Sequence, residues 1–218
     1  MHAVASALAD RTRARMLEEL LGGAPLPAGA LAARVGVAPS TASEHLAKLE
    51  RAGLITIERR GRAREARLAG PEVAEALEAL ARIAPDTERP IGLKQVNGRA
   101  ALREARSCYD HLAGRAGVKL TDDLLARGAL VERDGAFVVP PDAYGHYIET
   151  FGVDPAQLHG CRPLARPCQD WTERRPHLAG ALGAAILSAL LERGYVARRP
   201  DGRALNVTAR GAALFGGA

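Results

Sequence analysis

Hydrophobic positions recur at helical spacing through the first fifty residues. Apolar side chains follow one another three or four positions apart over 5–21 and again over 30–35, and glycine- and proline-rich stretches separate the two segments. The pattern predicts a helix over each segment, with Asp10 able to cap a second helical piece of the first. A turn containing Gly36 then leads to a further helix that begins at Pro39. Short helices joined by such a turn are typical of a helix-turn-helix.

The helix that begins at Pro39 is apolar on one face only. Ala42, Leu46 and Leu49 recur at three- and four-residue spacing, and Gly53 stands where a left-handed cap would end the helix. The other faces are polar, and hydroxyl, carboxylate and amino groups can contact bases or phosphates. These candidate DNA-contacting residues are Ser40, Thr41, Ser43, Glu44, His45 and Lys48. The alternative interpretation is that these polar residues form an ordinary solvated helix face.

A basic hairpin is predicted directly after this helix. Branched and apolar residues over 54–57 suit a strand, 59–62 is an arginine-rich turn, and 63–68 suits a return strand. The arginines that could neutralise phosphates or enter the minor groove are Arg59, Arg60, Arg62 and Arg64. Arg67 could instead pair with a carboxylate of its own subunit. Helix-turn-helix and hairpin together make residues 12–70 a predicted winged helix.

The motifs around this winged helix resemble those of a known family. They are ALADRTRARMLEEL before the helix-turn-helix, Ser-x-x-Ser-x-His-Leu within LAARVGVAPSTASEHLAKLERAGLI, and Arg-x-Gly-Arg in the wing. Over residues 3–84 the chain resembles the ArsR-type (arsenic-repressor-like) winged-helix regulators. The resemblance implies a cytoplasmic homodimer that regulates transcription from a palindromic DNA operator, usually as a repressor released by a ligand or by oxidation.

Residues 71–83 form a predicted helix with an apolar stripe. The resemblance implies that this helix packs against the other subunit, and the alternative is that it packs on its own domain. Two metal sites common in the family lack their ligands here. Ala32 and Ala33 lie where one site has Cys-x-Cys, and 71–84 contains no histidine for the other. Metal sensing is therefore not expected at those two positions.

The rest of the chain predicts a second domain of helices and small hairpins. The domains expected are a winged-helix and dimerisation domain over 1–84, a linker over 85–98 and a sensor or oligomerisation domain over 99–218, so the fold class is mainly α with small β-hairpins. In the second domain the pattern predicts helices over 100–114, 120–127, 140–151 and 170–193, and hairpins over 129–139 and 195–207. Residues 152–169 are expected to be irregular.

An internal repeat joins the two halves of the chain. LAKLERAGLITIERR, LLARGALVERDGAFVV and LLERGYVARRPDGRALNV share paired apolar residues, an arginine, a glycine and two strand-like segments. The glycines are Gly53, Gly128 and Gly194. One interpretation makes the later two copies winged-helix-like cores that lack a reading helix. The other is that any joint between a helix and a hairpin uses such residues.

The candidate sensor or ligand residues all lie in the second domain. They are Cys108, His111, Cys161, Cys168, Trp171 and His177. Cys108 and His111 lie three apart, on one face of the predicted helix, where they could chelate a metal or the histidine could lower the thiol pKa. A disulfide between Cys161 and Cys168 and an aromatic ligand pocket near Trp171 are further interpretations. Simple burial of these side chains is the alternative to all three.

Net charge and cysteine content indicate the kind of partner and compartment but identify no particular ligand. The 218 residues carry a net charge of +5, and the pI is about 9.5. That suits a polyanionic partner, although 1–88 is neutral overall and its positive charge is concentrated in 58–68. Three cysteines and no signal-like start predict a reducing cytoplasm without membrane attachment.

Enzyme motifs such as a phosphate-binding loop or a nucleophile elbow do not occur, so no enzyme activity is expected. No cofactor and no particular metal is assigned. The partners expected are double-stranded operator DNA, a second copy of the chain, and a metal, oxidant or small-molecule effector. The alternative function is a thiol, metal or small-molecule sensor that acts through protein contacts rather than through DNA.

Overall fold

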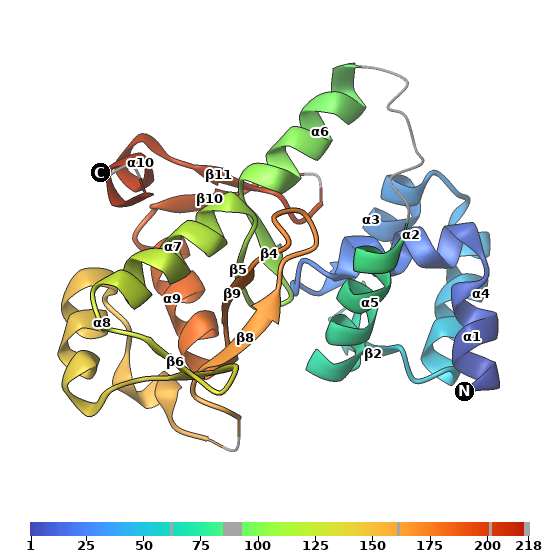
Figure 1. Ribbon diagram of the computed structural model, residues 1–218. Helices are drawn as coiled ribbons and strands as arrows, with labels where there is room; N and C mark the ends of the chain where they lie inside the picture. The colour runs from blue at the N-terminus through green and yellow to red at the C-terminus, as the bar shows by residue number, and fades with distance from the viewer. Residues whose placement is uncertain (62, 85–92, 161, 201, 216–218) are drawn as a thin grey trace. The chain divides into compact units, whose positions relative to one another are not determined.

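A computed structural model describes residues 1–61, 63–84, 93–160, 162–200 and 202–215, with the backbone alone for 93–97. Its helices are joined by small antiparallel hairpins, which confirms the predicted fold class (Figure 1). The chain forms two compact units, one from Met1–Ala84 and the other mainly from Pro85–Pro200 and Ala204–Ala218. Among the described residues, no helix combines the length and the hydropathy needed to cross a lipid bilayer.

The first unit is a winged helix. Its elements are α1 (His2–Leu8), α2 (Arg11–Leu20), β1 (Leu26–Pro27), α3 (Ala28–Val35), α4 (Pro39–Arg51), β2 (Ile55–Arg60), β3 (Ala63–Leu68) and α5 (Pro71–Ile83). The three strands form one antiparallel sheet in the order β1-β3-β2. Buried side chains of α2, α3, α4 and the sheet form its core, among them Met16, Leu17, Leu31, Leu49 and Ile55.

Local sequence signals set the ends of these helices. The predicted helix over 5–21 is two helices, and the carboxylate of Asp10 caps the second by accepting a hydrogen bond from the Arg13 amide at 2.9 Å. Pro39 occupies the first turn of α4, where its missing N–H costs nothing. Gly36 and Gly53 adopt left-handed conformations, with φ of 76° and 73°, at the two turns that flank α4.

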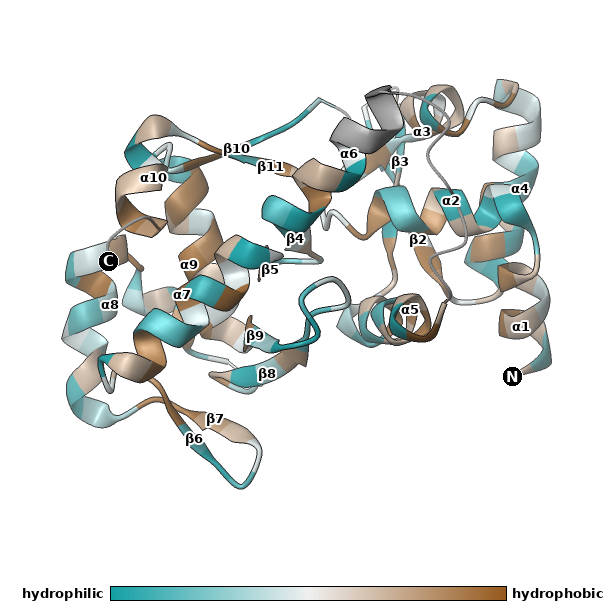
Figure 2. Ribbon diagram, turned by 45° about the horizontal axis from the view of Figure 1, so that its top comes forward, coloured by the Kyte–Doolittle hydropathy of each residue, from teal (hydrophilic) through white to brown (hydrophobic). Residues whose placement is uncertain are grey.

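The second unit surrounds α9 with helices and four two-stranded hairpins. Its elements are α6 (Leu93–Glu104), β4 (Arg106–Cys108), β5 (His111–Ala113), α7 (Arg115–Ala126), β6 (Val131–Arg133), β7 (Ala136–Val138), the 3-10 helix η1 (Pro141–Ala143), α8 (Tyr144–Phe151), the 3-10 helix η2 (Pro155–Leu158), β8 (Arg166–Gln169), β9 (Pro176–Ala179), α9 (Gly180–Glu192), β10 (Val196–Arg198), β11 (Leu205–Val207) and α10 (Ala209–Phe215). α9, which is largely apolar in Figure 2, packs in the core with residues of α7 and α8.

Two predicted helices of this unit are partly wrong. The predicted helix over 100–114 ends at Glu104, and the hairpin β4–β5 follows it. The predicted helix over 170–193 begins only at Gly180, because Pro176 starts β9, which pairs with β8. Residues 152–169, expected to be irregular, include η2 and β8.

The predicted linker also differs from the structure. Helix α6 begins at Leu93, inside the span 85–98, and residues 85–92 lie outside the described part of the chain.

The layout of the predicted threefold repeat is present in the structure. α4, α7 and α9 are each followed by a glycine in the left-handed conformation and then by a hairpin. The φ angles of Gly53, Gly128 and Gly194 are 73°, 69° and 68°. The same cap therefore turns the chain from helix to hairpin three times.

Candidate nucleic-acid interface and sensor residues

Helix α4 divides sharply into a buried and an exposed face. Ala42, Leu46 and Leu49 are each no more than 2% exposed and pack into the first unit. The predicted contact residues on the other faces are exposed: Ser40, Thr41, Ser43, Glu44 and Lys48. The hydroxyl of Ser43 donates to the Pro39 carbonyl at 3.0 Å, so it also supports the first turn of its own helix. The remaining side chains are available to a ligand outside the domain.

His45 lies differently from the other predicted contact residues. Its side chain is only 15% exposed, and its Nδ1 lies 3.7 Å from Oδ1 of Asp10, the residue that caps α2. The ring is therefore directed toward its own domain. This placement argues for a structural role rather than for a base contact.

The wing carries two kinds of arginine. On one face of the hairpin, Arg67 binds Glu58 at 2.6 Å and Arg60 lies 4.0 Å from Glu65. The pairing of Arg67 with a carboxylate of its own subunit agrees with the sequence interpretation. On the other face, Arg59 and Arg64 are directly opposite each other in the β2–β3 ladder, and both are exposed.

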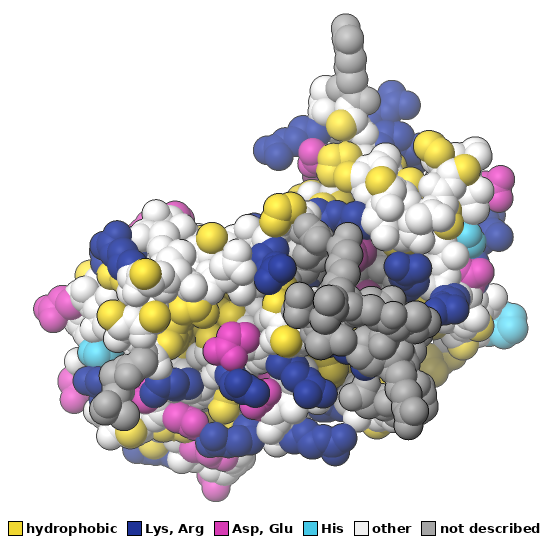
Figure 3. Space-filling view, turned by 90° about the horizontal axis from the view of Figure 1, so that it is seen from above, with side chains coloured by type: hydrophobic (Ala, Val, Ile, Leu, Met, Phe, Trp, Pro, Cys, Tyr) yellow, Lys and Arg dark blue, Asp and Glu magenta, His cyan; other side chains and the backbone are white. Residues whose placement is uncertain are grey.

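Arg59 and Arg64 have no acidic partner in the described part of the chain. Like charges placed directly opposite each other destabilise a hairpin, and a bound polyanion would remove that cost. Arg62, the fourth predicted wing residue, lies outside the described residues. On the face seen in Figure 3, basic side chains lie among acidic ones rather than in one continuous field.

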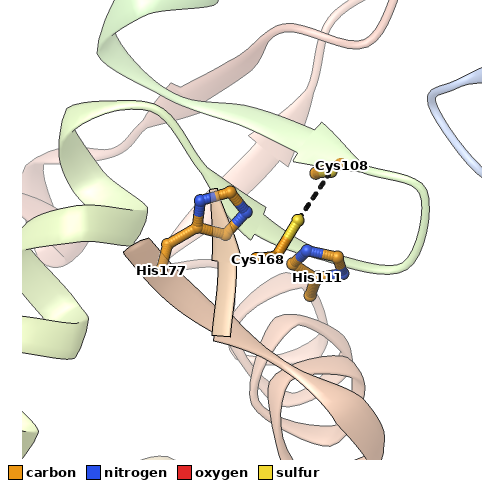
Figure 4. Close-up of side chains that lie close together, drawn as sticks. All are labelled: Cys108, His111, Cys168 and His177. Atoms are coloured by element: carbon orange, nitrogen blue, oxygen red, sulfur yellow. Dashed lines mark hydrogen bonds between the residues drawn. The ribbon is translucent and has the colours of Figure 1, made fainter. Parts of the chain in front are cut away.

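Four of the predicted sensor residues meet in the second unit. Cys108, His111, Cys168 and His177 are all buried, and their candidate ligand atoms lie within 4.8 Å of one another (Figure 4). We call these four residues the Cys–His cluster. Cys108 and His111 are opposite each other in the β4–β5 ladder rather than on one helix face, which corrects the expected geometry.

No disulfide forms within this cluster. The Sγ atoms of Cys108 and Cys168 are 3.9 Å apart, whereas a disulfide requires about 2.05 Å. The contact with Cys168, together with burial, raises the pKa of the Cys108 thiol to about 12. Cys161, the third cysteine, lies outside the described residues, and so does its predicted disulfide with Cys168.

Trp171 stands beside the cluster rather than in it. The guanidinium of Arg106 lies 5.0 Å from the Trp171 ring centroid and forms a fully buried ion pair with Asp170, with Nη2 and Oδ2 2.9 Å apart. Burial opposes ionisation of Asp170, but Arg106 outweighs it and holds the pKa of this carboxyl below its ordinary value. The large aromatic residues Tyr147 and Phe151 are buried in the core cluster around α9, to which Trp171 does not belong.

Sequence reasoning missed Arg106, Asp110 and Asp170 as residues of this region. Asp110 contacts Nδ1 of His111, and Asp170 contacts Nδ1 of His177. A signal was present in the sequence: the string His-Leu-Ala-Gly-x-x-Gly occurs at 111–117 and again at 177–183. The recurrence of this string indicates that the two histidines occupy equivalent positions in two related segments of the second unit.

A winged helix with an exposed polar face on its second motif helix defines the helix-turn-helix class of DNA-binding domains. A family model described as a helix-turn-helix domain matches residues 8–58. The uncharacterized HTH-type transcriptional regulator YdfF of Bacillus subtilis is 39% identical over 213 residues, which is 97% of this chain and 93% of the relative. This match spans both units.

Other similarities are confined to less than half of the chain. The HTH-type transcriptional regulator CmtR of Mycobacterium tuberculosis is 42% identical over 101 residues, 45% of this chain and 81% of the relative. The NMR structure of this cadmium sensor is 36% identical and covers 43% of this chain and 99% of its own, with a TM-score of 0.34.

The chain belongs to the ArsR-type family of winged-helix transcriptional regulators. It is a transcriptional regulator with a helix-turn-helix DNA-binding domain.

Proposed function

We propose that the protein is a homodimeric repressor that binds a two-fold symmetric operator through α4 and the wing. The observation that carries the proposal is the facing pair Arg59 and Arg64, exposed and without an acidic partner among the described residues, next to the exposed polar face of α4. α4 has the dimensions that fit a major groove, and the arginines suit the adjacent phosphates or minor groove. Operator half-sites would lie roughly 10 bp apart, one helical turn.

An apolar stripe on α5 supports the homodimer. Leu80 and Ile83 are 44% and 79% exposed, and Ala76 lies exposed one turn before Leu80. Large apolar side chains that stand exposed in a row are typical of a protein interface. A second copy of the chain would cover this stripe and place a second α4 on the same duplex.

We assign the effector response to the second unit. Cysteine thiols and imidazoles are the groups through which metals and oxidants act on proteins, and the Cys–His cluster brings two of each together. The metal, oxidant or small molecule would change operator affinity by favouring one conformation of the dimer.

DNase footprinting on the DNA upstream of the protein's own gene tests the proposal, with sedimentation of the same sample for its mass. We expect a protected site with two-fold symmetry and a dimer. A monomer that binds this DNA no better than bulk DNA at physiological salt contradicts it. A dimer that binds no DNA favours the alternative of a sensor that acts through protein contacts.

The dimer surface has its own test. Leu80→Asp with Ile83→Asp should give a monomer and abolish the footprint, because two carboxylates would be buried without partners. Arg82→Gln, an exposed change on the same helix, is the matched control and should leave both unchanged. A dimer that persists in the double variant would place the interface elsewhere.

A further inference from the structure

The second unit is built from two copies of one pattern. Residues 111–128 and 177–194 align without a gap, and nine of the eighteen positions are identical, including His, Leu, Ala and Gly at the start and Arg-Gly at the end. An Arg-x-Cys precedes each copy, at 106–108 and 166–168. The copies differ mainly in the turn between Cys and His, which is six residues longer in the second.

The two copies have the same local structure. Cys108 is opposite His111 in the first hairpin, and Cys168 is opposite His177 in the second. Each second strand is followed by a glycine with positive φ and then by a helix, α7 or α9. A sequence repeat with the same strand register and the same following helix is a structural duplication.

The copies pack on each other reciprocally. α7 packs against β9 of the second copy, and α9 packs against β5 of the first. A Cβ on Gly117 would lie 3.7 Å from Cβ of His177, and one on Gly183 would lie 3.2 Å from Cβ of His111. Each histidine is therefore held against the helix of the other copy. The Cys–His cluster lies where the two copies meet, and each copy contributes one thiol and one imidazole.

The spacing of the four side chains fits one tetrahedral ion. Zinc–sulfur bonds of about 2.3 Å in a tetrahedron place two sulfurs about 3.8 Å apart. The Sγ atoms of Cys108 and Cys168 are 3.9 Å apart, and all four candidate ligand atoms lie within 4.8 Å of one another. Figure 4 shows the four side chains, two from each hairpin, lying close together. Two thiolates and two imidazoles are a ligand set typical of zinc.

The imidazoles are oriented as metal ligands usually are. Nδ1 of His111 lies 3.2 Å from Asp110, and Nδ1 of His177 lies 3.4 Å from Asp170. The Nε2 atoms of both rings, and Nδ1 of His177, are buried without a hydrogen-bond partner among the described residues. The hydrogen bond to Asp110 fixes the tautomer of His111 and leaves its Nε2 to bind a metal, while His177 offers either ring nitrogen. Burying two such nitrogens with no ligand would be costly.

The charges around the cluster balance when a divalent ion is present. Two thiolates neutralise one divalent cation, and the two neighbouring carboxylates have their own cations. Asp170 pairs with Arg106 at 2.9 Å, and Asp110 pairs with Arg162 at 2.6 Å. No uncompensated charge is then left in the buried site.

We propose that Cys108, His111, Cys168 and His177 bind one divalent zinc-type ion that joins the two copies of the second unit. Four protein ligands complete a tetrahedron, so the site is closed to substrate. This proposal identifies the ion that binds to the cluster to which we assign the effector response. It rests on the proposed function only where it implies that the ion regulates operator binding. Metal binding is measured without DNA, so its failure is distinguishable from failure of the proposed operator binding.

The test is metal analysis of the purified full-length protein, followed by replacement of the metal with Co²⁺. We expect about one zinc ion per chain. The cobalt form should show the strong visible absorption of a tetrahedral site and sulfur-to-cobalt charge transfer in the ultraviolet. Less than stoichiometric zinc after reconstitution under reducing conditions, or the weak spectrum of an octahedral site, would overturn the proposal.

Variants identify the ligands. Cys168→Ser and His177→Gln should lose stoichiometric zinc, while Cys161→Ser and His146→Gln, a histidine of α8 outside the cluster, should keep it. Asp110→Asn removes a charge beside a ligand but no ligand, and should weaken zinc binding roughly 10- to 100-fold with an unchanged cobalt spectrum. Full zinc content and an unchanged cobalt spectrum in Cys168→Ser would contradict the assignment, and so would loss of zinc in Cys161→Ser.

An oxidation experiment distinguishes a metal site from a redox switch that uses the same two cysteines. We expect mild peroxide treatment of the zinc-loaded protein to leave Cys108 and Cys168 unoxidised, because bound metal protects their thiolates from forming a disulfide. Rapid formation of a disulfide between them, at the same rate with and without zinc, would replace the metal site with a dithiol switch.

Discussion

The two units of this chain differ in whether their polar functional groups are exposed or buried. In the winged helix, Thr41, Lys48, Arg59 and Arg64 are exposed, and no acidic side chain among the described residues pairs with Arg59 or Arg64. In the second unit, the four residues of the Cys–His cluster, Arg106 and Asp170 are all buried. Exposed, unpaired charge suits a large ligand that brings its own counter-charge, whereas a buried set of soft donors suits an ion.

The two units also differ in how their charges are stabilised. Around α4 and the wing, removal of a side chain changes what the surface can bind and leaves the core untouched. In the second unit, the same removal leaves a partner buried alone. The comparison therefore predicts that stability effects concentrate in the second unit and binding effects in the first.

The largest stability effect is expected at the buried ion pair. Asp170→Ala should lower the free energy of unfolding by about 3–5 kcal/mol, because Arg106 would be left buried without its counter-charge. Asp122→Ala is the matched control: its pair with Arg175 is exposed, so its loss should cost only about 0–1 kcal/mol. Denaturant unfolding of the reduced protein measures both. Equal losses would show that burial does not distinguish these two pairs.

A smaller effect is expected where helix α7 lies close to strand β5 of the same copy. Gly117→Ala should destabilise by about 1–3 kcal/mol, because its Cβ would lie 2.4 Å from the Leu112 carbonyl oxygen. Gly145→Ala adds the same methyl group in α8, where nothing lies within 4 Å, and should stabilise by about 0.4–1 kcal/mol. Thermal unfolding compares the two variants. If Gly117→Ala leaves the stability unchanged, strand β5 and helix α7 can move apart at little cost in free energy.

The smallest effect is expected in the winged helix. Asp10→Ala should cost about 1 kcal/mol through loss of the α2 cap, and Asp10→Asn, which keeps an acceptor, only a few tenths. The Arg13 amide holds the pKa of Asp10 below its ordinary value, so its contribution is present at neutral pH and is lost as pH falls through that lowered value. The asparagine variant should lack this pH dependence. An unchanged acid dependence in the asparagine variant would remove Asp10 from this role.

The winged helix could be predicted closely from the sequence because its signals are local. Asp10, Pro39 and Gly53 mark helix ends by rules that need no tertiary contact, and the stripe on α4 fixes its buried face. The hairpin expected over 129–139 follows from a local signal too, because the dipeptide Asp134-Gly135 favours the positive φ that both residues adopt.

The hairpins that carry the Cys–His cluster lack such signals. Their turns use Tyr109 and Arg174 with φ of 60° and 55°, where sequence rules look for glycine or asparagine. Gly114 is the last residue of the predicted helix over 100–114, and Gly180 lies inside the predicted helix over 170–193. In the structure, each glycine instead joins a strand to a helix. These strands are stabilised by contacts far apart in sequence, such as the Gly114 amide donating to Asp170 at 2.7 Å. The sequence therefore names four residues that lie close together in the structure, but it predicts the wrong secondary structure around them.

The dependence of operator affinity on salt tests the central claim most directly, measured for the wild type, for Arg59→Ala with Arg64→Ala, and for Arg67→Ala. Each phosphate contact contributes about 0.9 to the slope of log affinity against log salt, so the double variant should lose roughly 2 per subunit together with much of its affinity. Arg67→Ala, whose arginine already pairs with Glu58, should keep the wild-type slope. An unchanged slope in the double variant, or an equal loss in Arg67→Ala, would contradict DNA binding through this wing.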